Sequence, residues 1–351
     1  MMPLPDNTNV NRYQGSINSM PDISILIPTA NRPQFLTNSL VSVARQSLIN
    51  RIAEVVVMEN GGNRASEQIC KRFPQLPIRY VYRKSQIPHA GLMASWFGEA
   101  RFPIVAMLHD DDWWVDFHLA RGVSSLEQNS DAVAAYSSCC RVADETAWTM
   151  SLYGSFIAWF ADATAPAGGL RKLSFEQVLL ASLLATGFHM SSLIAFKSAI
   201  EASLENLHDG NEFDVDRSLA VEFSLHGKLL FSDTPSVFVR IHPGQDSGTA
   251  AVNSFERIWF PRTTRRLLNL ARDSSIEVRS RLAERFTHLG LDFYAIADQC
   301  TETSLDTLYA ESLLPASMVN DYRINKRNTK IRRQVRSLRN LVQRFKSKLG
   351  S

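Results

Sequence analysis

Residues 23–58 read ISILIPTANRPQFLTNSLVSVARQSLINRIAEVVVM, and they contain two apolar runs separated by a stretch of helical length. The runs ISILIP (Ile23–Pro28) and AEVVVM (Ala53–Met58) are short and rich in branched residues, which is typical of buried strands. Between them, Gln34–Gln46 spaces its apolar residues as an amphipathic helix does. The segment therefore predicts a βαβ unit with parallel strands and a right-handed crossover.

The same alternation continues along the chain. Further strands are predicted at Ile78–Tyr82, Pro103–Leu108 and Ala132–Tyr136, and further helices at Arg64–Phe73, Ala90–Ala100 and near Asp116–Gln128. This order indicates a Rossmann-like α/β sheet. Beyond residue 140 the pattern becomes mixed, with helices expected at Phe175–Leu184 and Val215–His226, strands at Ser192–Phe196, Leu229–Ser232 and Ser236–Ile241, and helix from about residue 253 onward.

The composition is that of a globular protein. Of 351 residues, 45% are hydrophobic and 21% are charged, which excludes a disordered or collagen-like chain. The four cysteines form no CxxC pair and no disulfide framework, so we expect reduced thiols and a cytoplasmic protein. The first twenty residues are polar and predict a flexible leader rather than a secretory signal. No segment is expected to cross a membrane.

Polar segments follow three of the predicted strands at the edge where open parallel sheets bind ligands. They are PTANR at residues 28–32, ENGG at residues 59–62 and HDDDWW at residues 109–114. Three adjacent carboxylates repel one another, and a divalent cation with a bound diphosphate would compensate their charge. A solvated acidic turn that caps the next helix is the structural alternative. Neither a GxGxxG nor a GxxxxGK[ST] motif occurs in the sequence, so a dinucleotide site and a P-loop lack their usual support.

Taken together, these segments resemble family 2 glycosyltransferases. The resemblance rests on SILIPTANRPQFLTNSLVSVARQS, EVVVMENGG, IPHAGLMASWFGEAR, MLHDDDWW and LHGKLLFSDTPSVFVRIHPGQDS, which span residues 22 to about 248. It implies a Rossmann-like GT-A fold, an α/β fold with a mixed central sheet, followed by a C-terminal helical extension. The expected organisation is a leader at 1–20, a transferase domain at 21–250 with a nucleotide-sugar half (21–138) and an acceptor half (139–250), and a helical region at 251–351.

The resemblance also implies roles for individual residues. The donor site would include Pro28, Thr29, Arg32, Glu59, Asp110 and Arg240, with Glu59 accepting hydrogen bonds from the nucleobase. The expected ligands of Mg²⁺ or Mn²⁺ are Asp111 and His242. Position 109, where the family often has Asp, is His here, and His109 is left out of the metal set. Trp114 offers an aromatic face for a sugar, although one of the two tryptophans at 113 and 114 is expected in the core.

Transfer with inversion needs a base that takes the proton of the acceptor hydroxyl. The family supplies a carboxylate at the start of a helix in the second half, usually as Glu-Asp. The corresponding pair here is Val215-Asp216, so the Glu is missing and Asp216 is the candidate base. Glu212 and Asp214 lie close by and could substitute. Charge that favours a helix N-terminus is the structural alternative for all three.

The expected function is an inverting, metal-dependent glycosyltransferase that moves a sugar from a nucleoside-diphosphate-sugar to a saccharide or lipid-linked saccharide acceptor. A role in bacterial surface polysaccharide or glycolipid synthesis follows by analogy only. One alternative is a non-catalytic nucleotide- or sugar-binding scaffold on a degenerate GT-A fold, which the missing Glu and His109 keep open. Another is a sugar nucleotidyltransferase, which should carry a Gly-rich phosphate loop that PTANRP does not provide.

The C-terminal residues 322–351 contain eleven Lys or Arg and no Asp or Glu, whereas the whole chain carries a net charge of +3. Within them Ile331, Val335, Leu338, Val342, Phe345 and Leu349 form one apolar stripe on a predicted helix. Such a helix suits an anionic membrane surface, which would place the protein at the inner face of the cytoplasmic membrane. The spacing also suits a coiled coil or packing on the domain. No motif supports nucleic-acid binding.

Overall fold

A computed structural model describes residues 22–30, 32–85, 94–142, 148–150, 169–184, 188–204 and 215–242. All of them lie in the compact unit Met1–Phe255. The expected leader, the domain boundary at residue 250 and the region 251–351 fall outside the described residues. Within the described part of the chain, every helix is too short or too polar to cross a membrane.

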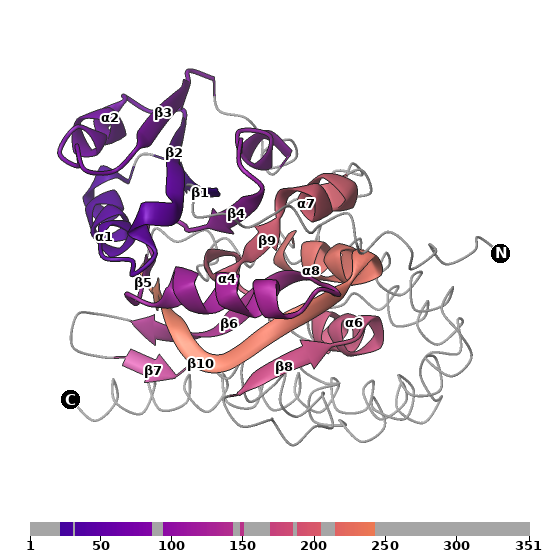
Figure 1. The fold of residues 1–351 in the computed structure, drawn as a ribbon. Coiled ribbons are helices and arrows are strands. Elements are labelled where there is room, and N and C mark those ends of the chain that lie inside the picture. The colour runs from indigo at the N-terminus through magenta and orange to yellow at the C-terminus, as the bar shows by residue number, and fades with distance from the viewer. Residues whose placement is uncertain are drawn as a thin grey trace, which may run out of the picture. The chain divides into compact units, whose positions relative to one another are not determined.

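The described part of the chain contains ten strands, six α-helices with defined bounds and a further helical turn at residues 94–97 (Figure 1). The strands are β1 (Ile23–Thr29), β2 (Ile52–Asn60), β3 (Ile78–Arg83), β4 (Ile104–Met107), β5 (Trp113–Trp114), β6 (Ala132–Val142), β7 (Trp148–Met150), β8 (Leu170–Leu173), β9 (Ile194–Phe196) and β10 (Lys228–Arg240). The helices are α1 (Pro33–Ala44), α2 (Ala65–Cys70), α4 (His118–Gln128), α6 (Phe175–Leu184), α7 (Lys197–Leu204) and α8 (Val215–His226). Two 3₁₀ turns, η2 (Ile49–Arg51) and η3 (Met190–Ser192), complete the set.

The strands form one mixed sheet in the order β3-β2-β1-β4-β9-β6-β10-β5, with β7 on β6 and β8 on β10. Strands β1 to β4 are parallel, as the βαβ reading of the sequence predicts. Strand β9 is antiparallel to both of its neighbours, β4 and β6, so the sheet changes direction at its centre. This arrangement confirms the predicted α/β fold with a mixed central sheet.

Helix α1 covers the first strands because its apolar residues recur on one face. Leu36, Leu40 and Val43 follow one another at spacings of four and three, and all are fully buried. Pro33 occupies the first turn, where its missing N–H costs no hydrogen bond. The helix therefore begins shortly after β1. Arg32 lies between the two elements, at the carboxyl end of β1.

Strand β10 differs from the expected pair of strands, because Lys228–Arg240 is one continuous strand. Figure 1 shows it as a single long, bent strand. Its pairing with β6 shifts register between Ser232 and Val237, around Pro235, which has no N–H for the ladder. The predicted break between two strands is therefore a bulge within one strand. Beyond the bulge, β10 continues to Arg240, which contacts the acidic loop, residues 109–112.

Candidate active site

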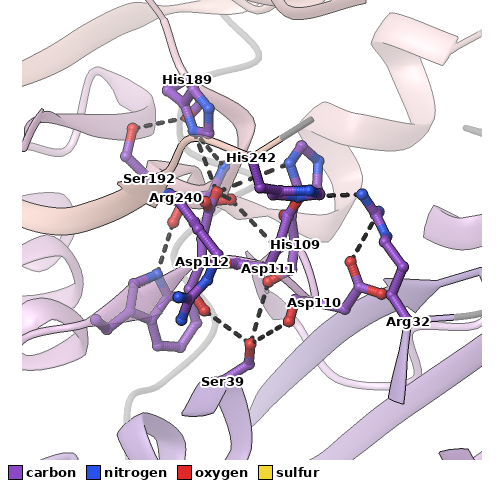
Figure 2. Close-up of polar contacts among 12 residues, drawn as sticks. Arg32, Ser39, His109, Asp110, Asp111, Asp112, His189, Ser192, Arg240 and His242 are labelled. Atoms are coloured by element: carbon purple, nitrogen blue, oxygen red, sulfur yellow. Dashed lines mark hydrogen bonds and ion pairs between the residues drawn. The ribbon is translucent and has the colours of Figure 1, made fainter. Parts of the chain in front are cut away.

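Residues that follow three strands, β1, β4 and β10, lie close together at the carboxyl ends of these strands (Figure 2). The acidic loop, residues 109–112, follows β4, while Arg32 follows β1 and His242 follows β10. The side chains of Asp110, Asp111 and Asp112 are nearly inaccessible to solvent, with exposures of 0%, 5% and 1%. The structure therefore excludes the freely solvated acidic turn that the sequence left open.

Asp110 is held from the end of β1. Thr29 donates a hydrogen bond from Oγ1 to Asp110 Oδ2 at 2.6 Å, and Arg32 Nη2 lies 2.8 Å from Oδ1. Burial raises the pKa of Asp110 to about 7 although the guanidinium of Arg32 acts in the opposite direction. The predicted proximity of Thr29, Arg32 and Asp110 is thus present in the fold.

Asp111 is contacted from two sides. Arg32 Nη1 donates to Asp111 Oδ2 at 3.0 Å, and His242 Nε2 lies 3.1 Å from the same oxygen. Burial opposes ionisation of Asp111, but the charges of Arg32 and His109 and the contact with His242 hold its pKa below its usual value. Asp111 and His242, the pair expected to hold a metal, are therefore in direct contact.

Two further residues shape the acidic loop. Ser39 on α1 places its Oγ 2.8 Å from the carbonyl of Asp110 and 2.7 Å from that of Asp112. Arg240 donates from Nε to the carbonyl of Asp111 at 3.2 Å, and its guanidinium lies over the rings of Phe35 and Trp113. Ser39 could not be predicted as part of the site, because a serine inside an amphipathic helix carries no functional signal.

Asp112 lies among polar groups from another part of the chain. Ser191 donates from Oγ to its Oδ2 at 2.5 Å, and the backbone N–H of Arg240 donates to Oδ1 at 3.1 Å. The Nδ1 atoms of His109 and His189 each lie 3.9 Å from Oδ2. Burial, followed by the charge of Asp111, raises the pKa of Asp112 well above its usual value.

Glu59 is buried at the end of β2, beside Thr29 in the sheet. Tyr80 donates from its hydroxyl to Glu59 Oε2 at 2.5 Å, whereas Oε1 has no hydrogen-bond partner in the described part of the chain. A buried carboxylate oxygen without a partner is rare and suits an additional donor. Pro28, which precedes Thr29 in β1, is also buried.

Trp114 belongs to the core. Its side chain is 2% exposed, stacks on His118 and donates from Nε1 to the carbonyl of Ser191 at 2.6 Å. Trp113 stacks on Phe238 and contacts Arg240. A cavity of about 500 Å³ is lined by α1, residues 113–117 and Phe238, and the three loop carboxylates are not part of its lining. The charged contacts rather than this cavity therefore define the candidate site.

Asp216 lies at the second position of α8, as expected for a carboxylate at the start of a helix. Its side chain lies outside the described residues, and so do Glu212 and Asp214. Its assignment as the base stays a prediction.

The contacts at Asp111 and His242 fit Mg²⁺ or Mn²⁺. One carboxylate and one imidazole whose ligand atoms lie 3.1 Å apart can share an ion, with water and phosphate oxygens completing its shell. A second group, His109, Asp112 and His189, also brings metal-ligating atoms within 4.8 Å of one another. The described part of the structure thus contains potential metal ligands beyond the expected pair Asp111 and His242.

Comparison with known proteins assigns the family. Residues 24–171 match the sequence profile described as glycosyl transferase family 2. They form a family 2 glycosyltransferase domain. A validoxylamine A glucosyltransferase from Streptomyces hygroscopicus subsp. limoneus is 31% identical to the present chain over 81 residues, which are 23% of this chain and 18% of the relative.

Solved structures with the same fold include S. aureus TarS 1–349 in complex with UDP and in complex with UDP-GlcNAc. Each superposes with a TM-score of 0.56 at 13% identity and covers 88% of this chain and 92% of the TarS chain. This likeness confirms the GT-A-like fold of the glycosyltransferase domain. The match over residues 24–171 confirms the resemblance to family 2 glycosyltransferases that is expected from the sequence.

Proposed function

We propose that this glycosyltransferase transfers a sugar from a nucleoside-diphosphate-sugar to an acceptor hydroxyl with inversion at the anomeric carbon, and that it depends on Mg²⁺ or Mn²⁺. The observation that carries the proposal is the convergence of Arg32, Asp111 and His242 at the ends of three strands. A buried carboxylate in contact with an imidazole and a guanidinium suits a metal–diphosphate group. TarS, which shares the fold, forms complexes with UDP and UDP-GlcNAc.

The donor would lie across the carboxyl ends of β1, β2 and β4. Asp111 and His242 would hold the metal, which would neutralise charge on the departing nucleoside diphosphate. Arg32 and Arg240 supply guanidinium groups for phosphate oxygens. The unpaired Oε1 of Glu59 would accept a hydrogen bond from the nucleobase.

Asp216 is the proposed base. The acceptor oxygen forms a bond to the anomeric carbon while the bond between that carbon and the diphosphate oxygen breaks. The hydroxyl proton passes to the Asp216 carboxylate. Attack on the face opposite the leaving group inverts the configuration, and the site contributes by holding both substrates in line.

The donor proposal is tested by calorimetric titration of the full chain with UDP, GDP, dTDP and CDP, each with and without Mn²⁺. We expect one nucleotide to bind tightly, only with metal, and to bind at least about tenfold more weakly to Asp111→Asn because a charged ligand is lost. Asp116→Asn is the matched control, because Asp116 pairs with Arg45 on the surface. A protein that binds no nucleotide under any condition would contradict the proposal.

A second measurement separates a catalyst from a non-catalytic scaffold. We expect Asp216→Asn to lose turnover by at least about a hundredfold, the usual scale of general-base catalysis, and to keep nucleotide affinity. A scaffold would show no turnover in the unsubstituted protein. If Asp216→Asn kept full activity, Glu212 or Asp214 would become the candidate base.

We also propose a saccharide or lipid-linked saccharide as the acceptor, in the synthesis of bacterial surface polysaccharide or glycolipid. The basic, apolar-striped residues 322–351 support a peripheral position at the inner face of the cytoplasmic membrane. Both statements rest on the sequence and on analogy with the family.

A further inference from the structure

Three metal-ligating side chains face one another beside the acidic loop (Figure 2). His109 and Asp112 come from the loop itself, and His189 comes from the residue before η3. The Nδ1 atoms of both histidines lie 3.9 Å from the same oxygen, Asp112 Oδ2. The central strand β9 brings them together. It pairs antiparallel with β4, so the segment before it, which contains His189 and η3, lies beside the loop that follows β4.

We propose that His109, Asp112 and His189 bind a divalent transition-metal ion of the zinc class, at a site separate from Asp111 and His242. Two imidazole nitrogens and one carboxylate oxygen are a donor set of zinc sites that keep an open position. Imidazole favours such ions over Mg²⁺, which prefers oxygen ligands. The two sets share no residue, so either can be removed without deleting a ligand of the other.

The separations need only small side-chain rotations. Zinc lies about 2.0–2.2 Å from nitrogen and oxygen ligands, so atoms that share one ion lie about 3–3.5 Å apart. In the present structure each histidine Nδ1 lies 3.9 Å from Asp112 Oδ2, and no two ligand atoms of the group are more than 4.8 Å apart. These distances are only slightly longer than those in a zinc site. His189 Nδ1 accepts one hydrogen bond, from the Ser191 N–H at 3.3 Å, and so long a bond is weak and easily replaced.

Charge and access favour an ion here. Asp112 is 1% exposed, and its hydrogen bonds at 2.5 Å and 3.1 Å come from neutral donors, the Ser191 hydroxyl and the Arg240 N–H. Arg32 pairs with the neighbouring Asp110 and Asp111. Burial makes the charge of this carboxylate costly, and a cation would offset that cost. The His109 side chain is 31% exposed, which gives an ion a route from solvent.

The test uses Co²⁺ as a spectroscopic substitute for zinc, added to the full chain without nucleotide. We expect ligand-field absorption bands that saturate, disappear when Zn²⁺ is added, and persist in excess Mg²⁺. His109→Ala and His189→Ala should each weaken Co²⁺ binding by at least about tenfold, the scale on which lost ligand interactions act. His226→Ala, which removes a histidine at the end of α8, should bind Co²⁺ normally.

Asp111→Asn separates this site from the proposed donor site. We expect it to keep Co²⁺ affinity within about threefold while it loses Mn²⁺-dependent nucleotide binding. The inference is overturned if the folded protein gives no Co²⁺ bands, if neither histidine variant weakens them, or if Asp111→Asn alone abolishes them. Circular dichroism checks folding, and the partly exposed His109 decides the matter if His189→Ala does not fold. Because no nucleotide is present, failure of the donor proposal would leave this result unaffected.

Discussion

The hydroxyl group of Tyr80 positions the carboxylate of Glu59, the proposed contact of the nucleobase. It donates to Glu59 Oε2 at 2.5 Å and leaves Oε1 for a ligand. Burial and this hydrogen bond raise the pKa of Tyr80, so the group remains a donor at neutral pH. We expect Tyr80→Phe to weaken nucleotide binding by about tenfold, because a hydrogen bond to a charged group contributes about 1.5–3 kcal/mol. Calorimetric titration measures the change.

Tyr82→Phe is the matched control for this prediction. Tyr82 lies two residues further along the same strand, but its hydroxyl donates to the carbonyl of Gly62 at 3.0 Å on the surface. This substitution should leave nucleotide affinity nearly unchanged. Equal losses in the two variants would mean that the hydroxyl of Tyr80 does not position Glu59.

His118 makes the stability of the domain depend on pH. Burial lowers its pKa to about 3, so the folded protein keeps the imidazole neutral while the unfolded chain takes up a proton near pH 6.5. Between these values the unfolded state carries more protons on this residue, so the contribution of His118 to stability falls as pH falls. We expect His118 alone to lower stability by about 2 kcal/mol between pH 7.5 and 5. Denaturant unfolding at both pH values should show a smaller loss in His118→Gln.

This comparison cancels the loss of the contact between His118 and Ser236, because that loss acts at both pH values. The same pH dependence in His118→Gln and in the unsubstituted protein would contradict the prediction.

The junction between α8 and β10 requires a glycine. A Cβ at Gly227 would lie 2.5 Å from Cγ1 of Val133 and 2.9 Å from the carbonyl oxygen of Asp131. That carbonyl accepts the N–H of Lys228 at 2.8 Å and cannot move freely. We expect Gly227→Ala to lower the free energy of unfolding by about 1–3 kcal/mol, as overpacking does. Urea denaturation measures the change.

Gly122→Ala in α4 provides the comparison. Its nearest obstacle is the terminal carbon of Ile194, which can rotate away, and alanine gains up to about 1 kcal/mol in helix propensity. Gly227→Ala should therefore cost more. A milder effect at Gly227 would show that the junction relaxes.

At the scale of elements, much of the fold could be predicted from the sequence. The βαβ alternation, α6 and α8 agree with their predicted ranges closely, because burial on one or two faces leaves a periodic pattern in the sequence. Strand β5 has two residues and α7 follows β9 without a loop, so neither gives a separate local signal. The continuity of β10 depends on β6, which accommodates the bulge at Pro235.

At the scale of the whole molecule, we predict that the basic C-terminal residues direct the protein to anionic membranes. Full-length protein should co-sediment with vesicles of anionic phospholipid and not with neutral ones. Replacing Arg332, Arg336 and Arg339 with Gln should weaken this binding by about a hundredfold, because each basic residue contributes about 1 kcal/mol. Added salt should reduce binding as well.

The matched control replaces three exposed arginines of the glycosyltransferase domain, Arg72, Arg101 and Arg121, with Gln. This variant has the same net charge as the tail variant and should bind vesicles nearly as the unsubstituted protein does. Equal binding by all three proteins would favour a role of the tail in packing or in a coiled coil.

The roles of Thr29, Arg32 and Asp110 were predicted through the family resemblance. The sequence by itself determined the fold class and the positions of two polar segments, residues 28–32 after β1 and the acidic loop after β4. These depend on local periodicity and on the rule that open parallel sheets bind ligands at their carboxyl edge. The proximity of Asp111 to His242 was predicted only through the family resemblance, since 131 positions separate the two residues.

Only the tertiary structure decided the remaining features of the site. Ser191 lies 79 positions from Asp112, and Ser39 lies 71 positions from Asp110. The histidine pair around Asp112 forms because β9 is inserted antiparallel between β4 and β6. Strand order is set by the packing of the whole sheet, and no local pattern encodes which distant side chains that order brings together.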